Sequence, residues 1–479
     1  MILAIDQGTT GTTCLVVGDD LRPRGRGYRA IAQHFPRPGW VEHDPEEIWH
    51  SVLSAAEAAL ADARARPAEL RAIGIANQRE TTLLWERKTG RPVHRAIVWQ
   101  DRRTAERCRR LPADLIRERT GLVPDPYFSA TKLEWLLREV ARGGDLAFGT
   151  VDAWLVWKLS GGRAHVTDVS NASRTLLVAL ATLDWDDELL ALFGVERELL
   201  PKIRCSSEVV AEAELLGATL PVAGIAGDQQ AALFGQACFR SGQAKATFGT
   251  GTFVLAHTGG DRSPPPSGLV RTAAARVAGQ PPRYALEGSI FVTGAALQWL
   301  RDGLGLIADA AESDRLAASL QGNDGVYFVP ALAGLGSPHW APEARGLVTG
   351  LTRATGRAHL ARAALEAIAY QTRDVTEAMP LALEALRADG GATANRFLMQ
   401  FQADVLGIPV EVASERETTA VGAAALAGLA VGLWSGPDEL ASLWRPGARY
   451  EPRLERAEAD RLQAEWREAV ALALRGASG

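Results

Sequence analysis

The sequence predicts an α/β protein built as two related lobes that face one cleft. Strand-like apolar runs alternate with helical patterns along the chain, as in mixed α/β proteins. A strand that ends at an aspartate and a Gly/Thr-rich hairpin occur near the start of the chain and again near its middle, which suggests an internal repeat. At 479 residues the chain is also too long for one ordinary domain. We place the boundary near Gly235, between residues 1–235 and 236–479.

The first half opens with a predicted β-hairpin. Residues 2–5 and 14–17 are short apolar runs on either side of the Gly/Thr-rich segment 6–13. Apolar and alanine positions at helical spacing then predict a helix over residues 45–66. The apolar run 72–76 predicts a further strand.

The second half repeats these signals imperfectly. Residues 221–228 form an apolar run that ends at Asp228, and we expect this run to be the first strand of the second lobe. Residues 246–255 predict another hairpin with a Gly/Thr tip. A strand over residues 325–329 and a helix over residues 360–386 complete the alternation.

Three further segments have a clear pattern. The Pro/Gly/Ser-rich residues 259–268 predict an exposed loop. Residues 418–437 carry no charge but are rich in Gly and Ala, so we expect a buried, closely packed helix and not a membrane span. Residues 451–479 predict a polar helical tail.

Composition indicates a soluble globular protein, since 47% of the residues are apolar and 23% are charged. A net charge of −5 leaves no basic footprint for nucleic acid. The four cysteines have no metal-ligand or disulfide spacing, which favours a reducing compartment. The first residues lack the pattern of a signal peptide. We therefore expect a cytoplasmic protein with no nucleic-acid partner and no membrane insertion.

The first Gly/Thr-rich turn is a candidate phosphate site. Glycine lets the backbone approach a ligand, and the hydroxyl and N–H groups of Thr9, Thr10 and their neighbours can hold phosphate oxygens. Asp6, at the end of the strand, can hold Mg²⁺ through its water shell. Taken alone, the motif is equally well interpreted as an ordinary polar turn. It is not a Walker loop, because no Gly-Lys-Ser/Thr follows.

Asp228 is a candidate general base. A carboxylate at the end of a strand can accept the proton of an attacking alcohol, as the catalytic aspartate of other kinases does. A helix N-cap before Gln229 is the structural alternative. The matching positions of Asp6 and Asp228, each at the end of an apolar strand, favour the functional interpretation.

Polar and aromatic residues could together accommodate a polyol. Arg79 and Glu80 follow the strand 72–76, and side by side they can donate to and accept from hydroxyl groups. A surface ion pair is the alternative. Trp99, Tyr127 and Phe253 could wall a carbon chain, although such residues are more often plain core.

Residues 389–395 are a candidate nucleotide contact. Two glycines there would let a flat base lie against the backbone, and Asn395 could reach an adenine edge. A simple turn explains the same residues equally well.

Taken together, these segments resemble the FGGY family of carbohydrate kinases over nearly the whole chain. The most specific blocks are residues 38–45, 77–82, 125–129, 227–235 and 334–340. The resemblance implies two actin/hexokinase-like (ribonuclease H-like) lobes around an interdomain cleft. Among the members of this family the chain is most similar to those that phosphorylate glycerol with ATP and Mg²⁺ to give sn-glycerol 3-phosphate, as homodimers or homotetramers.

The resemblance also implies a role for particular residues. Asp228 would be the general base, and Asp6 with Asp228 would place Mg²⁺. The glycerol pocket would contain Arg79, Glu80, Trp99, Tyr127, Asp228, Gln229 and Phe253. The positions expected to hold ATP are Thr9, Thr10, Gly11, Thr13, Thr250, Gly294, Gln298, Gly391 and Asn395.

One position departs from the family pattern, and it leaves alternatives open. The family usually has arginine where this chain has Thr13, and such an arginine would stabilise charge on the transferring phosphoryl group. Thr13 therefore leaves open a slow enzyme, a nearby basic residue that takes over, or a weakly active sensor that binds a polyol or a nucleotide. A kinase of another polyol or sugar in the same family is a separate alternative, because the sequence resolves the shape of the pocket poorly. Arg79, Glu80, Trp99 and Phe253 favour the three-carbon substrate, and the presence of Asp6 and Asp228 favours an active kinase.

Overall fold

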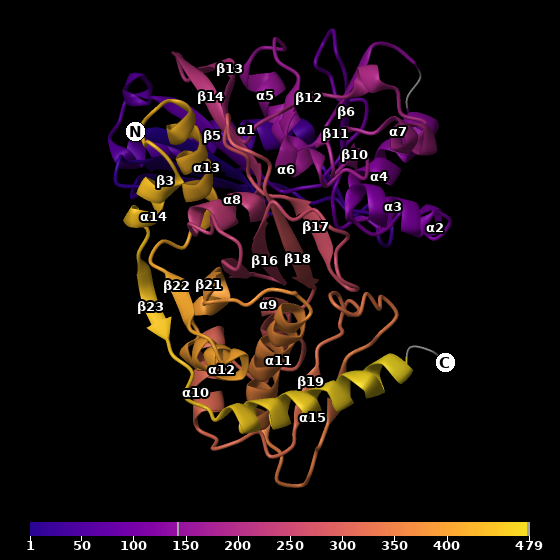
Figure 1. Ribbon diagram of the computed structural model, residues 1–479, viewed down its shortest axis with the longest axis vertical. Helices are drawn as coiled ribbons and strands as arrows, with labels where there is room; N and C mark the ends of the chain where they lie inside the picture. Colours follow the sequence, from indigo (N-terminus) through magenta and orange to yellow (C-terminus); the bar gives the residue numbers. More distant parts are fainter. Residues whose placement is uncertain (141–142, 477–479) are drawn as a thin grey trace.

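The computed structural model describes residues 1–140 and 143–476, and its two main sheets lie in two lobes (Figure 1). The first sheet has the strand order β13 (Ser207–Leu215), β14 (Ala218–Gly227), β5 (Ala72–Asn77), β1 (Ile2–Gln7), β2 (Gly11–Val17), β3 (Pro23–Ala30). The second has the order β17 (Val270–Ala273), β18 (Tyr284–Ile290), β16 (Thr252–Gly259), β15 (Ala244–Phe248), β21 (Leu386–Asp389), β22 (Val410–Ala413), β23 (Pro446–Tyr450).

The two sheets are wound in the same way. In the first, β1 pairs antiparallel with β2 and parallel with β5. In the second, β15 pairs antiparallel with β16 and parallel with β21. Each sheet therefore joins a hairpin to parallel strands, and the predicted α/β fold with two related lobes is confirmed.

Short strand pairs and helices surround the two sheets. The short pairs are β4 (Glu42–His43) with β7 (Ala96–Ile97), β6 (Leu83–Glu86) with β8 (Leu146–Gly149), β9 (Val166–Asp168) with β12 (Lys202–Arg204), β10 (Val178–Ala179) with β11 (Asp184–Trp185), and β19 (Tyr327–Val329) with β20 (Leu347–Thr349). The α-helices are α1 (Pro45–Ala63), α2 (Ala105–Cys108), α3 (Ala113–Thr120), α4 (Ser129–Trp135), α5 (Val151–Leu159), α6 (Val169–Ala172), α7 (Asp187–Phe193), α8 (Asp228–Gly235), α9 (Gly294–Gln298), α10 (Ala310–Ala318), α11 (Arg357–Glu377), α12 (Arg396–Leu406), α13 (Thr418–Ala430), α14 (Pro437–Leu443) and α15 (Arg456–Arg475).

Most of the predicted elements are present. Both Gly/Thr hairpins, the helix α1, the strands β5 and β19, and the loop between β16 and β17 lie where the sequence patterns predict them. The helix α15 lies within the predicted tail 451–479, of which residues 477–479 are outside the described residues. The helix predicted over residues 360–386 extends further toward the C-terminus than the helix in the structure. In the structure α11 stops at Glu377, and β21 begins at Leu386, because Pro380 lies between them and cannot continue a helix.

The strand that ends at Asp228 does not open the second lobe, so that prediction is wrong. This strand, β14, pairs parallel with β5 inside the first sheet. An apolar run that stops at an aspartate carries no information about which strand will lie beside it. The chain crosses to the second sheet only after α8.

Helix α13 comes late in the chain but packs on the first lobe. In Figure 1 it lies, in yellow, among the indigo and magenta elements. A Cβ atom added at Gly74 would lie 2.1 Å from the carbonyl oxygen of Ala423, and one added at Gly224 would lie 2.6 Å from the Ala427 nitrogen. The predicted buried helix is therefore confirmed, and glycines on β5 and β14 allow its close approach. No helix within residues 1–140 and 143–476 is long and apolar enough to cross a bilayer.

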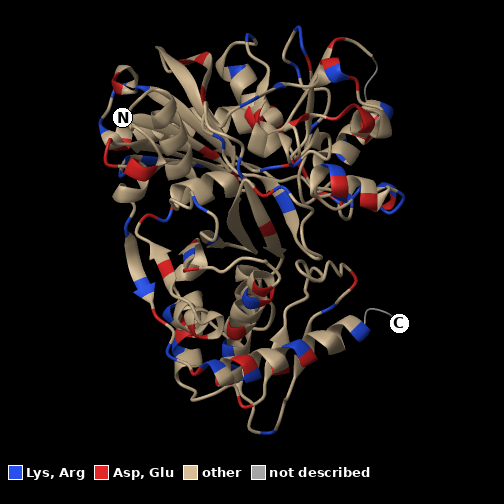
Figure 2. Cartoon of the chain, viewed as in Figure 1, with Lys and Arg blue, Asp and Glu red and all other residues tan. Residues whose placement is uncertain are grey.

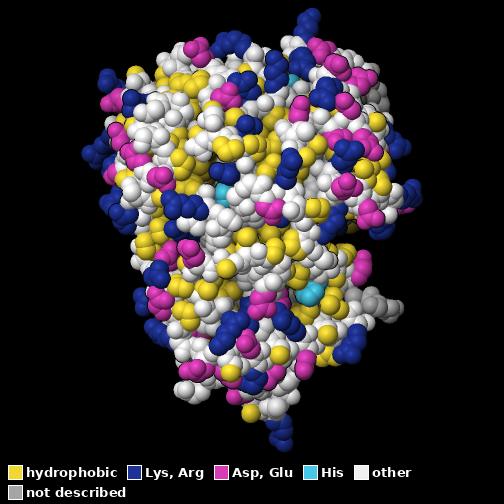
Figure 3. Space-filling model, viewed as in Figure 1, with side chains coloured by type: hydrophobic (Ala, Val, Ile, Leu, Met, Phe, Trp, Pro, Cys, Tyr) yellow, Lys and Arg dark blue, Asp and Glu magenta, His cyan; other side chains and the backbone are white. Residues whose placement is uncertain are grey.

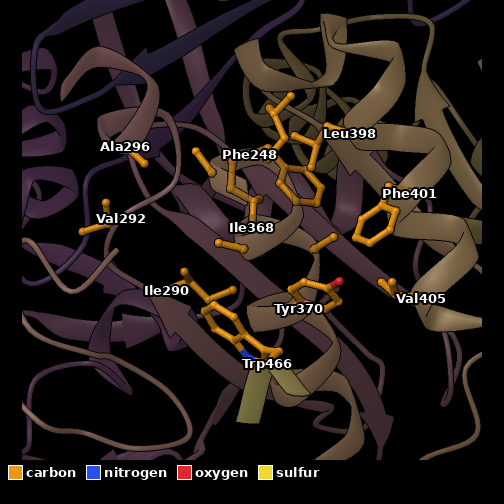
Figure 4. Close-up of a cluster of buried hydrophobic side chains, with 14 of the residues drawn as sticks. Phe248, Ile290, Val292, Ala296, Ile368, Tyr370, Leu398, Phe401, Val405 and Trp466 are labelled. Carbon is orange, nitrogen blue, oxygen red and sulfur yellow. The ribbon is translucent and has the colours of Figure 1, made fainter. Parts of the chain in front are cut away.

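The core of the second lobe lies on one face of its sheet. Figure 4 shows Phe248 of β15 packed with Ile368 and Tyr370 of α11 and with residues of α12. Along β15, Ala244, Ala246 and Phe248 belong to this core. The alternate residues must point to the other face, toward the first lobe, because side chains alternate along a strand.

Charged side chains of both signs are spread over both lobes (Figure 2). They intermingle on the face shown in Figure 3, and along α15 Arg461 pairs with Glu458 and Glu465. That face carries no continuous basic area of the kind that holds nucleic acid.

Candidate active site

Three parallel strands bring the predicted polar residues to one edge of the first sheet. Strands β1, β5 and β14 run parallel, with β5 in the middle. Asp6 lies near the end of β1, Arg79 and Glu80 follow β5, and Asp228 follows β14. The carboxyl ends of parallel strands form the usual place for a ligand in such sheets.

Arg79 joins this edge to the second lobe. Its side chain is 1% exposed, and its Nε lies 3.1 Å from Oδ1 of Asp228. Its two terminal nitrogens donate to Glu287 of β18 at 2.6 and 3.0 Å, and one of them also donates to the Tyr127 hydroxyl at 3.1 Å. One guanidinium therefore holds both the candidate base and a wall of the candidate pocket.

A second buried arginine completes an ion network around Arg79. Arg174 donates to Glu80 at 2.6 Å and to Glu287 at 3.1 Å, and all three side chains are at most 1% exposed. Burial alone would raise the pKa of Glu287, but the guanidinium groups of Arg174 and Arg79 outweigh it and lower the pKa to about 2. Two cations and two anions thus balance inside the protein.

Glu80 is held in an unusual backbone conformation. Its φ angle is +61°, in the left-handed region that residues with side chains seldom adopt. The hydroxyl groups of Thr82 and Ser129 donate to its carbonyl oxygen at 3.0 and 3.1 Å. Such local strain is typical of ligand sites whose surroundings fix the geometry.

Aromatic rings stand beside these polar groups. The ring centroids of Trp99 and Tyr127 are 5.5 Å apart, and those of Trp99 and Phe253 are 6.4 Å apart. Arg79 lies 5.9 Å from the centre of the Phe253 ring. The site therefore combines hydroxyl-binding groups with an apolar wall, which suits a short polyol.

Asp228 and Gln229 begin helix α8. The backbone N–H of Gln229 donates to Oδ1 of Asp228 at 2.7 Å, and its side-chain nitrogen lies 3.3 Å from Oδ2. The side chain of Asp228 is 29% exposed, so a substrate can reach it. The helix starts at Asp228 itself, with Gly227 at the cap position.

Asp6 and Asp228 could together hold a divalent cation. Burial, and then the negative charges of Asp228 and Glu417, raise the pKa of Asp6 well above its ordinary value. A cation between the two carboxylates would offset that cost, so this donor set fits Mg²⁺. Within the described part of the chain no cluster of three or more potential ligands occurs, so Mg²⁺ would keep waters or phosphate oxygens as its other ligands.

The glycine-rich turns lie at the strand ends of both lobes. In the first turn the Gly8 N–H donates to the Gly11 carbonyl at 2.9 Å, and in the second the Gly249 N–H donates to the Gly251 carbonyl at 2.9 Å. The N–H of Gly294, at the start of α9, donates to the Gly249 carbonyl at 3.0 Å. Gly390 has a φ of +91°, and a Cβ there would lie 2.5 Å from the Phe248 carbonyl oxygen.

These contacts gather several predicted nucleotide residues around the second turn. Thr250 belongs to that turn, and Gly294 and Gly391 flank it, while Gln298 is exposed on α9. Trp99 links the aromatic wall to the first turn, because its Nε1 donates to the Thr9 hydroxyl at 2.9 Å. The candidate pocket thus adjoins the candidate phosphate site.

Two predicted positions have other contacts in the structure. The Asn395 side chain caps α12 by accepting from the Leu398 N–H at 2.8 Å, and it donates to Ser313 at 3.2 Å. Thr13 is buried on β2 opposite Asp6 and Tyr28, and the Tyr28 hydroxyl donates to the Thr10 carbonyl at 3.3 Å. The roles of Asn395 and Thr13 toward a nucleotide stay predictions.

Sequence reasoning missed Arg174, Glu287 and Lys245. Lys245 is completely buried on β15, and burial lowers its pKa to about 8 even though Asp389 and Asp228 act against the shift. None of these residues belongs to a local sequence motif, because each gains its partners only through the tertiary fold. Lys245 and Glu287 are charged residues inside otherwise apolar strands, which was a weak hint, while Arg174 lies outside the strands and gave none.

Two similarly wound lobes, with carboxylates and glycine-rich turns at their facing edges, define the class of two-lobed phosphotransferases. The chain belongs to the FGGY family of carbohydrate kinases. The model of the family's N-terminal domain matches residues 1–235, and that of its C-terminal domain matches residues 244–431.

Individual relatives match over nearly their whole length. The chain is 54% identical to glycerol kinase of Dechloromonas aromatica over 100% of this chain and 98% of that protein. It is 52% identical to glycerol kinase 2 of Thermotoga maritima over 99% and 98% of the two chains. The crystal structure of Plasmodium falciparum glycerol kinase with ADP superposes with a TM-score of 0.92 at 34% identity, covering 99% of this chain and 98% of the other.

Proposed function

We propose that this chain transfers the γ-phosphoryl group of ATP to glycerol, giving sn-glycerol 3-phosphate and ADP. The observation that carries the proposal is the arrangement of polar groups beside aromatic rings. Arg79 and Asp228 meet within 3.1 Å beside the rings of Trp99, Tyr127 and Phe253, and Trp99 donates to Thr9 of the first glycine-rich turn. Identities of 52–54% to full-length glycerol kinases support the same substrate.

The proposed mechanism uses the groups already described. Arg79 donates to a glycerol hydroxyl while Glu80 and Tyr127 orient the others, and Trp99 and Phe253 pack on the carbon chain. Asp228 accepts the proton of a terminal glycerol hydroxyl while the oxygen of that hydroxyl attacks the γ-phosphorus. The bond between the γ-phosphorus and the bridging oxygen breaks, and that oxygen leaves with ADP. Because each lobe supplies part of the site, alignment of donor and acceptor depends on both.

The ATP site is proposed at the turns of both lobes. Thr9, Thr10, Gly11 and Thr13 would contact phosphates from the first lobe, and Thr250, Gly294, Gln298, Gly391 and Asn395 would contact the nucleotide from the second. Asp6 and Asp228 would hold Mg²⁺, which neutralises charge on the phosphates when bound. The boundary near Gly235 would then divide a lobe with the glycerol pocket and the first phosphate loop, residues 1–235, from a nucleotide-binding lobe, residues 236–479.

Location and assembly follow from the resemblance and are proposals of the same kind. We infer a cytoplasmic enzyme that forms a homodimer or homotetramer. Sedimentation of the purified protein would test the assembly, and a single species of monomer mass would contradict it.

Thr13 is the observation behind the rival function. A neutral residue there motivates a weakly active sensor that binds a polyol or nucleotide without efficient turnover. A kinase of another polyol or sugar is the second alternative, since the shape of the pocket decides between related substrates. Identities of 52–54% to full-length glycerol kinases do not favour either alternative.

The deciding experiment follows ADP release from the purified protein with Mg-ATP and one polyol at a time. Glycerol, xylulose, ribulose, erythritol and no substrate are compared. We expect strong turnover with glycerol and little with the other polyols or without substrate. Turnover that prefers a longer polyol would reassign the substrate, and binding of glycerol or ATP without turnover would favour the sensor.

A further inference from the structure

Lys245 is a buried cation between the two lobes that the proposed mechanism does not use. It lies on β15, with an exposed fraction of 0%. Its Nζ donates to the Thr247 hydroxyl at 2.8 Å and to the side-chain oxygen of Gln229. In the described part of the chain no carboxylate forms an ion pair with it within 4.0 Å. Burying a charge is costly unless it is paired or hydrogen-bonded, so these two hydrogen bonds are the main short-range compensation for the buried ammonium group.

The alternation of side chains along β15 directs Lys245 toward the candidate active site. Ala244, Ala246 and Phe248 face the core of the second lobe, so Lys245 and Thr247 face the first lobe. Thr247 lies opposite Phe253 in the sheet. The face of the sheet that carries Lys245 on β15 thus also carries Phe253 of the aromatic wall on β16, and Lys245 contacts Gln229 at the start of α8.

The chemistry of Gln229 makes the contact with Lys245 directional. An ammonium group can only donate hydrogen bonds, and an ionised carboxylate can only accept them. Gln229 lies between the two, so its amide oxygen must face Lys245 and its nitrogen must face Asp228. The distances agree, since the amide nitrogen lies 3.3 Å from Oδ2 of Asp228. A reversed amide would bring two acceptor oxygens together.

The two oxygens of Asp228 are held in different ways. The backbone N–H of Gln229 and the Nε of Arg79 hold Oδ1 at 2.7 and 3.1 Å. Oδ2 has the Gln229 side chain as its donor. The Gln229 amide is therefore the contact that holds Oδ2, the oxygen that Arg79 and the backbone leave free.

We propose that Lys245 is a positioning residue for phosphoryl transfer, which holds the Gln229 amide so that it donates to Asp228 and fixes the carboxylate toward the substrate hydroxyl. The inference rests on the proposed role of Asp228 as the base. It links a strand of the second lobe to the reacting group of the first. Misplacement of a catalytic group by about 1 Å can cost about 100-fold in rate.

Lys245→Met removes the charge and keeps a similar length. We expect kcat to fall about 10- to 100-fold, while the glycerol KM changes less than about threefold. Lys132→Met is the matched comparison. Lys132 is also buried, but it donates to the carbonyls of residues 126–128 beside the aromatic wall, so its loss should raise the glycerol KM instead. Wild-type kcat in folded Lys245→Met would overturn the inference.

Variants of Gln229 test the same chain of contacts, and the comparison of Gln229→Glu with Gln229→Leu does so even if Lys245→Met does not fold. Gln229→Glu keeps a partner for Lys245 but cannot donate to Asp228 when ionised, so kcat should fall as far as in Gln229→Leu. The losses in Lys245→Met and Gln229→Leu should not multiply in the double variant, because both break one chain. Full kcat in Gln229→Glu, or losses that multiply, would contradict the proposal.

Asp228→Asn, measured in the same assay, distinguishes a failure of the proposed role of Lys245 from a failure of the proposed role of Asp228. If Asp228→Asn loses turnover while Lys245→Met keeps it, only the role of Lys245 fails. If Asp228→Asn keeps turnover, the proposed base itself is wrong.

Discussion

Arg79 and Glu287 form a two-pronged ion pair that crosses from one lobe to the other. Arg79 follows β5 of the first sheet, Glu287 lies on β18 of the second, and the two N–O distances are 2.6 and 3.0 Å. Both side chains are at most 1% exposed. The pair leaves the Nε of Arg79 free to contact Asp228. It therefore fixes the guanidinium in the site and joins the lobes at a buried point.

Loss of the Glu287 charge should destabilise the protein. Glu287→Gln would leave Arg79 and Arg174 with Glu80 as the remaining buried anion of the network. Removing one partner of a buried pair costs about 3–5 kcal/mol. We expect the urea midpoint to fall clearly in Glu287→Gln. Asp302→Asn, which removes an exposed pair with Arg301, should leave the midpoint unchanged. Equal midpoints in the two variants would mean that the network adds little stability.

Asp228→Asn should abolish most of the turnover while leaving the pocket intact. The amide keeps the shape of the carboxylate but cannot accept the substrate proton as a base. General-base groups contribute about 10²- to 10⁴-fold, and we expect a loss of kcat of that order. Glycerol binding, measured by calorimetry, should persist. Asp438→Asn is the control, since Asp438 is 91% exposed and pairs with Arg240 on the surface. A kcat within about threefold of wild type would exclude Asp228 as the base.

Phe253→Ala should relax the choice of substrate. The ring packs against Trp99, so its removal opens room for a longer carbon chain and takes contact area from glycerol. Contacts of this size are worth about 1–3 kcal/mol, or about 10- to 200-fold in discrimination. The ratio of kcat/KM for erythritol to that for glycerol should rise. Phe35→Ala, at a 67% exposed phenylalanine, is the control. An unchanged ratio would place the size limit elsewhere.

His257 predicts a loss of stability in mild acid. Its Nδ1 accepts from the Gly259 N–H at 3.1 Å, and burial, aided by Arg283, lowers the pKa of His257 from 6.5 to about 4. Between these values the unfolded chain binds a proton that the folded chain does not, so stability falls as the pH falls from 6.5 to 4. At about 1.4 kcal/mol per pKa unit the contribution is on the order of 3 kcal/mol.

Urea unfolding at pH 7 and pH 4.5 measures this effect. His257→Gln should show a smaller decrease in midpoint than the wild type between the two conditions. His50→Gln, at an exposed histidine on α1, is the matched control. The same decrease in His257→Gln as in the wild type would assign the acid sensitivity to other groups.

The sequence predicts those parts of the candidate site that consist of neighbouring residues in the chain. Asp6, Arg79 and Asp228 follow apolar strands, and the turns around Thr9 and Thr250 have the glycines that a close backbone approach needs. Those signals are short-range, so no knowledge of the fold is needed to find them.

The sequence does not predict which residues distant in the chain contact one another in the folded protein. Glu287 appears in the sequence as one residue of a strand, and its two arginines lie 113 and 208 positions away in the chain. The same gap explains why the apolar run before Asp228 does not predict the lobe to which its strand belongs. Strand pairing is set by the packing of the whole sheet, which a local apolar run does not record.

Helix α13 has a consequence for how the protein is made on the ribosome. The face of the first sheet that carries Ala4, Ala76 and Ala226 packs against this helix, which ends only at Ala430. The nascent chain therefore emerges with that apolar face bare, and the cover arrives after the strands from β15 to β22 have been synthesised. A chain stopped before residue 418 would present an open apolar face, the kind of surface that chaperones bind and that leads to aggregation.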